Sequence, residues 1–221
     1  MKSPFTQAFT ELPGSLPIFP LNNALMLPDG ELPLNIFEPR YLNMVRDAMK
    51  SEQLIGMVQP TNTSTNVSDS NTTQPNLHRI GCAGRIVRYE ETLDGRLSIV
   101  LKGLCRFEIV QELSTVRGYR LVVPDWSKFE HDFAPTEPDN PQTKLLLHSS
   151  LRQYLKHNNI EADWDTITNI NLKTLMTLLF NSLPFSDEDK QLLIETSDLS
   201  EQLTVFRTIL EADIDASEIR H

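Results

Sequence analysis

The sequence predicts an α+β protein in which a β-rich first part is followed by a small bundle of helices. Between residues 80 and 123 apolar residues alternate with polar ones, which is the period of a strand. A segment rich in proline follows over residues 124–141. Beyond it, apolar residues recur every three or four positions, which is the period of a helix. The change of period indicates a β-rich part followed by a helical part.

The change of period sets the expected domain boundaries. A chain of 221 residues is long enough for one large domain or two small ones. We expect a β domain over residues 12–126, a linker over residues 127–141 and a helical bundle over residues 142–215.

Short apolar runs broken by proline and asparagine open the β domain. Residues 16–21 and 24–27 form two such runs, and residues 31–37 form a third after the turn signal Pro28-Asp29-Gly30. Proline is tolerated mainly at sheet edges, so these strands are expected to carry unpaired backbone groups. Such groups can accept an extended peptide by strand addition.

One amphipathic helix is predicted after these runs. Pro39 suits its first turn, where the missing N–H costs little. Six apolar residues then share one side of a helical projection. They are Tyr41, Leu42, Met44, Val45, Ala48 and Met49. We expect this face to cover the sheet.

A strand and a hairpin complete the prediction for the first part. Residues 54–58 are the strand, and residues 80–89 and 97–101 flank Asp94-Gly95, a dipeptide that tolerates the positive φ of tight hairpin turns. Residues 60–76 are rich in Thr, Asn and Ser with few large apolar residues, which predicts a mobile excursion.

Helical stripes and capping signals organise the second part. Leu147, Leu151, Tyr154 and Leu155 form one stripe, and residues 167–179 predict a second helix. After Pro184, Ser186 is expected to cap the next helix. Asp198, with Glu201 three residues later, is expected to cap the last one, whose stripe is Leu199, Leu203, Phe206 and Leu210.

Composition narrows the function classes. The net charge of −10 opposes binding to a phosphate backbone, which depends on cations that replace condensed counterions. The sequence has neither an apolar run of membrane-spanning length nor an apolar segment behind its first residues, so a cytoplasmic protein without membrane contact is expected. Cys82 and Cys105 are then expected to be buried thiols.

Signatures of catalysis are missing from the sequence. It has no Gly-Lys dipeptide, which the phosphate-binding P-loop requires, and neither a Cys-x-x-Cys pair nor a His-Glu-x-x-His motif. No Gly-x-Ser-x-Gly elbow occurs, and the five histidines are scattered. We predict no catalytic residue, no metal and no cofactor.

Two groups of ordered motifs resemble the family of the Lon protease N-terminal, substrate-binding domain. The first group is residues 16–22, residues 32–41 with the sequence Leu-Pro-Leu-Asn-Ile-Phe-Glu-Pro-Arg-Tyr, and residues 44–48. The second group is residues 81–87 followed by the segments that begin at Asp94 and at Gly103. The Phe-Glu-Pro-Arg-Tyr element is the most specific part.

The resemblance implies a fold and a function. The fold is a twisted, PUA-like β-barrel with one packed helix, followed by the helical bundle. The function is non-catalytic, ATP-independent peptide binding in protein quality control, by a stand-alone bacterial member that lacks the ATPase and Ser/Lys protease domains. The partners are unfolded or extended polypeptides, with a protease or chaperone as a further partner. The candidate peptide-binding residues are Leu34, Ile36, Phe37, Glu38, Arg40 and Tyr41.

Two alternatives stay open. The first is a small-molecule enzyme with its site between the sheet and the bundle, which a deep pocket with convergent titratable groups would favour. The second is RNA binding by analogy with PUA-type folds, which the acidic composition disfavours. Asn35 departs from the family pattern, in which a His often occupies this position, and leaves the ligand open.

Overall fold

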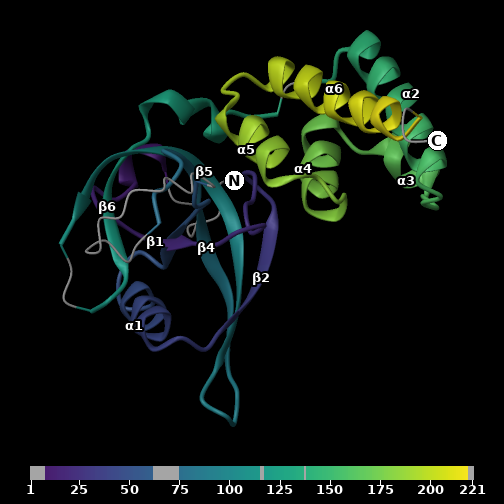
Figure 1. Ribbon diagram of the computed structural model, residues 1–221. Helices are drawn as coiled ribbons and strands as arrows, with labels where there is room; N and C mark the ends of the chain where they lie inside the picture. The colour runs from purple at the N-terminus through teal and green to yellow at the C-terminus, as the bar shows by residue number, and fades with distance from the viewer. Residues whose placement is uncertain (1–7, 62–74, 115–116, 137, 219–221) are drawn as a thin grey trace, which may run out of the picture. The chain divides into compact units, whose positions relative to one another are not determined.

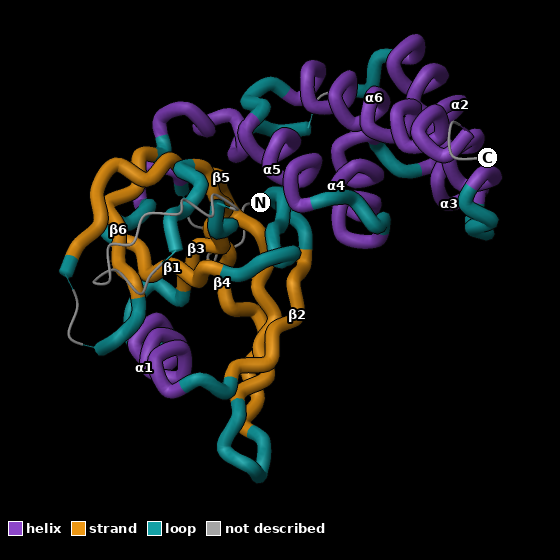
Figure 2. Tube along the Cα trace, viewed as in Figure 1, coloured by secondary structure: helices purple, strands orange, loops and turns teal. Residues whose placement is uncertain are grey.

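The structure, a computed structural model, describes residues 8–61, 75–114, 117–136 and 138–218, with side chains up to residue 214. The chain divides into two compact units, Met1–Ala134 and Pro135–His221. Figure 1 and Figure 2 show that the strands lie in the first unit and that the second is helical. Most of the predicted polar excursion, residues 62–74, lies outside the described residues.

The described residues of the first unit form a six-stranded sheet. The strands are β1 (Leu16–Pro20), β2 (Glu31–Ile36), β3 (Leu54–Val58), β4 (Ile80–Glu91), β5 (Leu97–Leu113) and β6 (Arg120–Asp125). Their order is β2-β5-β4-β3-β1-β6, and β5 also pairs with β6. Strands β5, β4, β3, β1 and β6 therefore close into a barrel, and β2 is attached to it through β5. The predicted α+β fold with a barrel-like sheet is confirmed.

The length of β5 makes this closure possible. Its first part pairs with β2, from Ile36 opposite Leu97 to Glu31 opposite Lys102. Its last part pairs with β6, with a register shift after Ile109. Such irregularities bend a strand, which helps the sheet to curl. Strand β4 pairs with β5 from Leu97 to Glu108, and their hairpin turns at Gly95 with φ +80°, as the sequence predicts.

The expectation that the first apolar run is an edge strand is wrong. Strand β1 pairs in parallel with β3 and antiparallel with β6, so both of its edges are occupied. The reason is the crossover through β2 and the first helix, which returns the chain beside β1 as β3. Among the described strands, β2 has β5 as its one neighbour and is the edge.

A continuous apolar core fills the barrel. Seven fully buried residues form it: Leu16, Ile18, Leu54, Val58, Ala83, Phe107 and Val122. The Trp126 ring packs on Phe107 with ring centroids 5.6 Å apart. Helix α1 (Pro39–Ala48) contacts β1 and β3, and its buried residues are Tyr41, Met44, Val45 and Ala48. The predicted amphipathic helix is confirmed.

The segment expected as a linker begins with ordered structure. Residues Ser127–Phe133 form a 3-10 helix, η2, that packs on β5 and buries Phe129. Its anchor is an ion pair between Asp132 and Arg106 of β5. Another short 3-10 helix, η1 (Phe9–Glu11), precedes the expected domain start at residue 12. The first unit thus extends past both expected boundaries.

The second unit is a bundle of helices. Its described helices are α2 (Pro141–His157), α3 (Trp164–Asn169), α4 (Leu172–Ser182), α5 (Asp187–Glu195) and α6 (Leu199–Glu218). The single helix predicted over residues 167–179 is divided, because Ile170 is extended and the Asn171 side chain caps α4 by accepting the Thr174 N–H.

Other predictions for the bundle are confirmed. Ser186 caps α5 by accepting the Asp189 N–H, and the Asp198 carboxylate accepts the Glu201 N–H at the start of α6. In the core, the Phe185 ring meets the Phe206 ring edge to face, with centroids 5.4 Å apart.

Candidate functional site

The turn from β2 into α1 carries the six predicted site residues. The antiparallel register places Leu34 opposite Ile99 and Ile36 opposite Leu97. Since side chains alternate across a strand, both point to the same face, and both are buried, with exposed fractions of 8% and 1%. These two residues belong to the core and present no side chain to a partner.

Phe37 lies immediately beyond the end of β2 and is exposed. Its side chain is 63% exposed, which is unusual for a large aromatic residue. The Arg96 guanidinium, from the β4–β5 hairpin, lies 6.0 Å from the centre of the Phe37 ring. Phe37 therefore offers an apolar surface flanked by a cation.

Glu38 and Arg40 form an exposed pair at the start of α1. The Glu38 carboxylate accepts from Arg40 Nε at 3.0 Å and lies 2.9 Å from Arg40 Nη2. Both side chains are nearly half exposed, so the pair adds little to stability. Arg40 also lies over the Tyr41 ring at 4.5 Å. The two charged groups remain accessible to a partner.

Tyr41 is part of the core rather than of the surface. Its exposed fraction is 6%, and its ring lies 4.1 Å from that of Phe19 on β1. Burial raises the pKa of the Tyr41 phenol, an effect that the nearby Arg40 partly offsets. The structure thus separates the six candidates into a buried set, Leu34, Ile36 and Tyr41, and an exposed set, Phe37, Glu38 and Arg40.

The β4–β5 hairpin adds further exposed apolar residues to the first unit. Val87, Tyr89 and Leu93 all lie on it and are exposed. The Tyr89 hydroxyl donates to Glu91, and this hydrogen bond raises the pKa of Tyr89. We call Phe37, Val87, Tyr89 and Leu93 the hairpin residues.

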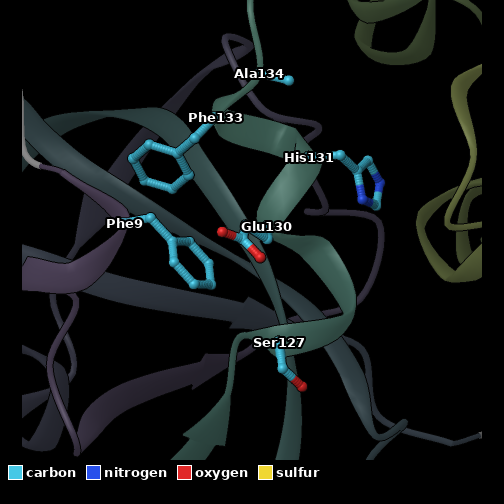
Figure 3. Close-up of a pocket in the computed structure, with 6 residues that line it drawn as sticks. All are labelled: Phe9, Ser127, Glu130, His131, Phe133 and Ala134. Atoms are coloured by element: carbon cyan, nitrogen blue, oxygen red, sulfur yellow. The ribbon is translucent and has the colours of Figure 1, made fainter.

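A pocket of about 590 Å³ lies on η2. It is lined by Phe9, Ser127, Glu130, His131, Phe133 and Ala134. The Phe9 and Phe133 rings meet edge to face with centroids 5.7 Å apart. Figure 3 shows the Glu130 carboxylate on the side where these rings lie, whereas the His131 ring points away. Sequence reasoning missed this pocket, because its residues fall before and after the expected β domain.

The described residues contain neither a metal-binding cluster nor a reactive thiol. They include no group of three or more His, Cys, Asp or Glu residues that could hold a metal ion. Cys82 and Cys105 are free and buried as predicted, and burial raises the pKa of both thiols, which keeps them protonated. No helix in the described ranges is both long and apolar enough to cross a membrane.

Comparison with protein families defines the class of the chain as a substrate-recognition module. Residues 15–212 match the family described as the ATP-dependent protease La (LON) substrate-binding domain. The chain belongs to this family. The resemblance seen in the motifs is confirmed, and the match continues through the helical bundle.

Similar proteins agree with this assignment. The Lon protease of Flavobacterium johnsoniae is 26% identical over 216 residues, which are 96% of this chain and 26% of that protein. The Lon protease of Anaeromyxobacter dehalogenans is 31% identical over 120 residues, which are 53% of this chain and 14% of that protein. The chain thus spans a minor part of the length of these relatives.

Two solved structures share the fold. The crystal structure of a Lon N-terminal domain protein from Xanthomonas campestris matches with a TM-score of 0.60 and 23% identity, over 86% of this chain and 95% of that one. The N-terminal domain of a Mycobacterium avium complex Lon protease matches with a TM-score of 0.63 and 16% identity, over 89% and 98%. At these identities the likeness concerns the fold.

Proposed function

We propose that this chain binds extended or unfolded polypeptide segments, without catalysing a reaction on them, through the surface around Phe37. The observation that carries the proposal is the exposure of this phenylalanine beside the accessible charges of Glu38 and Arg40. Aromatic residues and arginine are the side chains most often central to binding surfaces. Membership in a substrate-binding family supports the same function.

The hairpin residues suit a partner of varied sequence. Val87, Tyr89 and Leu93 present apolar area on the β4–β5 hairpin, and Phe37 presents it beside this hairpin, at the end of β2. Contact with scattered apolar side chains depends on buried area rather than on a defined set of hydrogen bonds. Such a surface accepts many sequences with modest affinity, which is what recognition of unfolded chains requires.

Strand addition at β2 is limited by one residue. Pro33 lies in the middle of β2 and has no N–H to donate to an added strand. A peptide can therefore pair with this edge only over a short stretch. We place the main contact at the Phe37 end of the strand, with backbone pairing as a secondary contribution.

The cellular role that we propose is recognition in protein quality control in the cytoplasm. The chain would act as an adaptor or holdase-like module that delivers clients to a protease or chaperone, without using ATP itself. The names of the Lon relatives support this role.

The test is binding to a permanently unfolded protein, such as reduced and carboxymethylated α-lactalbumin, followed by fluorescence anisotropy. Phe37→Ala is expected to weaken binding by about tenfold, the loss typical of a central aromatic contact. Val110→Ala is the matched control, because Val110 is also a largely exposed apolar residue of the first unit, on β5. It should bind like the unchanged protein.

Two results would contradict the proposal. One is the absence of measurable binding by the unchanged protein. The other is equal binding by the Phe37 and Val110 variants, which would move the contact away from the β2–α1 turn. Retention of RNA at low salt instead of polypeptide would favour the RNA-binding alternative.

A further inference from the structure

We propose that the pocket on η2 binds a cation carried on an aliphatic stem, such as the side chain of an arginine or lysine. The proposal is independent of the polypeptide-binding surface around Phe37, since the pocket has its own residues. The pocket is a depression of about 590 Å³ that is widely open to solvent, so it suits a side chain laid against the surface rather than an enclosed ligand.

The lining combines the two chemistries that such a ligand needs. Phe9 and Phe133 supply two rings, one edge-on to the other, against which methylene groups and a guanidinium plane can pack. Glu130 supplies a carboxylate that can accept hydrogen bonds from the cation. Figure 3 shows the carboxylate and the two rings on the same side of η2.

Glu130 is available for a ligand. Several carboxylates in the described part of the first unit already have an arginine partner: Glu31 pairs with Arg88, Glu38 with Arg40, Asp47 with Arg117 and Glu112 with Arg120. The nearby Lys128 pairs with Glu108 instead. Within the described ranges Glu130 has no partner, so a bound cation would not need to displace one.

The backbone that carries Glu130 is held on both sides. Phe129, the residue before it, is 1% exposed, and its carbonyl lies 3.6 Å from the Cys105 thiol, which donates to it. Asp132, two residues after it, is paired with the buried Arg106. A carboxylate between two fixed residues loses little backbone freedom on binding, which favours affinity.

Two sources can present this chemistry, a basic side chain of a polypeptide or a free alkylguanidinium or alkylammonium compound. The probe is Nα-acetyl-arginine N-methylamide, titrated into the full ¹⁵N-labelled chain and followed by the amide shifts of residues 127–134. Saturable shifts are expected there. The norleucine analogue, which has the stem without the charge, should produce none.

Glu130→Gln is the variant that tests the assignment. It keeps the shape of the side chain, removes the charge and lies on the surface, so folding should be unaffected. We expect the dissociation constant for the arginine probe to rise about fivefold. Glu90→Gln is the matched control, since Glu90 is another exposed glutamate of the first unit, outside the pocket, and its probe affinity should be unchanged.

The outcomes are distinct. If a blocked Ala-Arg-Ala peptide binds more tightly than butylguanidinium, the proposal is supported and the ligand is a basic side chain of a polypeptide. If butylguanidinium binds more tightly, the proposal is supported and the ligand is a free small molecule. Absence of saturable shifts at residues 127–134, an unchanged affinity in Glu130→Gln, or equal binding of the norleucine analogue would each overturn the proposal. None of these results depends on whether Phe37 contacts unfolded proteins.

Discussion

Arg106 and Asp132 form an ion pair in the interior of the first unit. Arg106 Nη2 lies 2.7 Å from Asp132 Oδ1, and the side chains are 2% and 5% exposed. Arg106 Nε and the backbone N–H of the same residue both donate to Asp132 Oδ2, at 3.1 Å and 2.9 Å. The guanidinium also lies 4.6 Å from the centre of the Phe129 ring. The pair joins β5 to η2.

Asp132→Asn is expected to lower the free energy of unfolding of the first unit by about 3–5 kcal/mol, because it leaves a buried guanidinium without its counter-charge. Urea unfolding measures this change. A Trp164→Phe background leaves Trp126, which packs on Phe107, as the single tryptophan, so fluorescence then reports on the first unit.

The matched control for that prediction is Asp94→Asn. Asp94 also pairs with an arginine, Arg96, but both side chains are largely exposed. Solvent screens such a pair, so the unfolding midpoint should hardly change. Similar, small effects in the two variants would show that the buried pair does not hold η2 in place.

Phe37→Ala and Tyr41→Ala are expected to differ sharply in stability. Phe37 is 63% exposed, and its truncation should change the free energy of unfolding by less than about 0.5 kcal/mol. Tyr41 packs on Phe19, and its truncation should cost about 3–5 kcal/mol. Thermal unfolding checks both values. Phe37→Ala is therefore the variant suited to a binding test. Equal destabilisation by the two variants would contradict the assignment of Tyr41 to the core and of Phe37 to the surface.

Gly103→Ala is expected to destabilise the first unit by at least about 1–3 kcal/mol, the cost of overpacking a filled site. A Cβ at residue 103 would lie 2.1 Å from the Leu27 carbonyl oxygen, so the backbone itself would have to move. Gly14→Ala is the control, because a Cβ there meets nothing within 4 Å. Urea unfolding should show a lowered midpoint for the first variant only.

His148 is expected to make the second unit less stable in weak acid. Desolvation lowers the pKa of His148, with Lys144 and Arg152 adding to the effect and Asp139 opposing it. Its Nε2 is buried without a hydrogen-bond partner in the described part of the chain. The unfolded state therefore takes up the proton more readily, so stability present above the ordinary pKa of 6.5 is lost as the pH falls through it.

The measurement is urea unfolding at neutral and at weakly acidic pH in a Trp126→Phe background, where Trp164 reports on the second unit. The loss of stability on acidification should be smaller in His148→Gln, which has no titrating group at this position. The quantity compared between the two proteins is the change in the free energy of unfolding from neutral to weakly acidic pH, so a difference in their stability at neutral pH does not matter. An equal loss in both proteins would contradict the prediction.

The strand alternation around the candidate site shows how far sequence reasoning could reach. Period two places Leu34 and Ile36 on one face of a strand but does not say which face is buried, and both residues, expected at a binding surface, lie in the core. Tyr41 lies on the predicted apolar face of the helix after Pro39, whereas Phe37 precedes that helix. The packing of Tyr41 against Phe19 on β1, 22 residues earlier, confirms that this helix face covers the sheet, and it removes Tyr41 from the exposed candidates.

The sequence predicts the local elements correctly: the hairpin at Asp94-Gly95, the helix after Pro39, and the caps at Ser186 and Asp198. These depend on the preferences of neighbouring residues, which a single chain displays directly. It also carried the ordered motifs by which the family was recognised.

Tertiary packing sets which strand edges are covered, where the first unit ends and which side chains lie together at η2. Asp132 pairs with Arg106, which is 26 residues earlier, and the Phe9 ring contacts the Phe133 ring across more than half of the chain. Such long-range contacts follow from the closure of β5 on β6 and from the register of distant strands. Local period and propensity do not encode that register, because one pattern is compatible with many pairings.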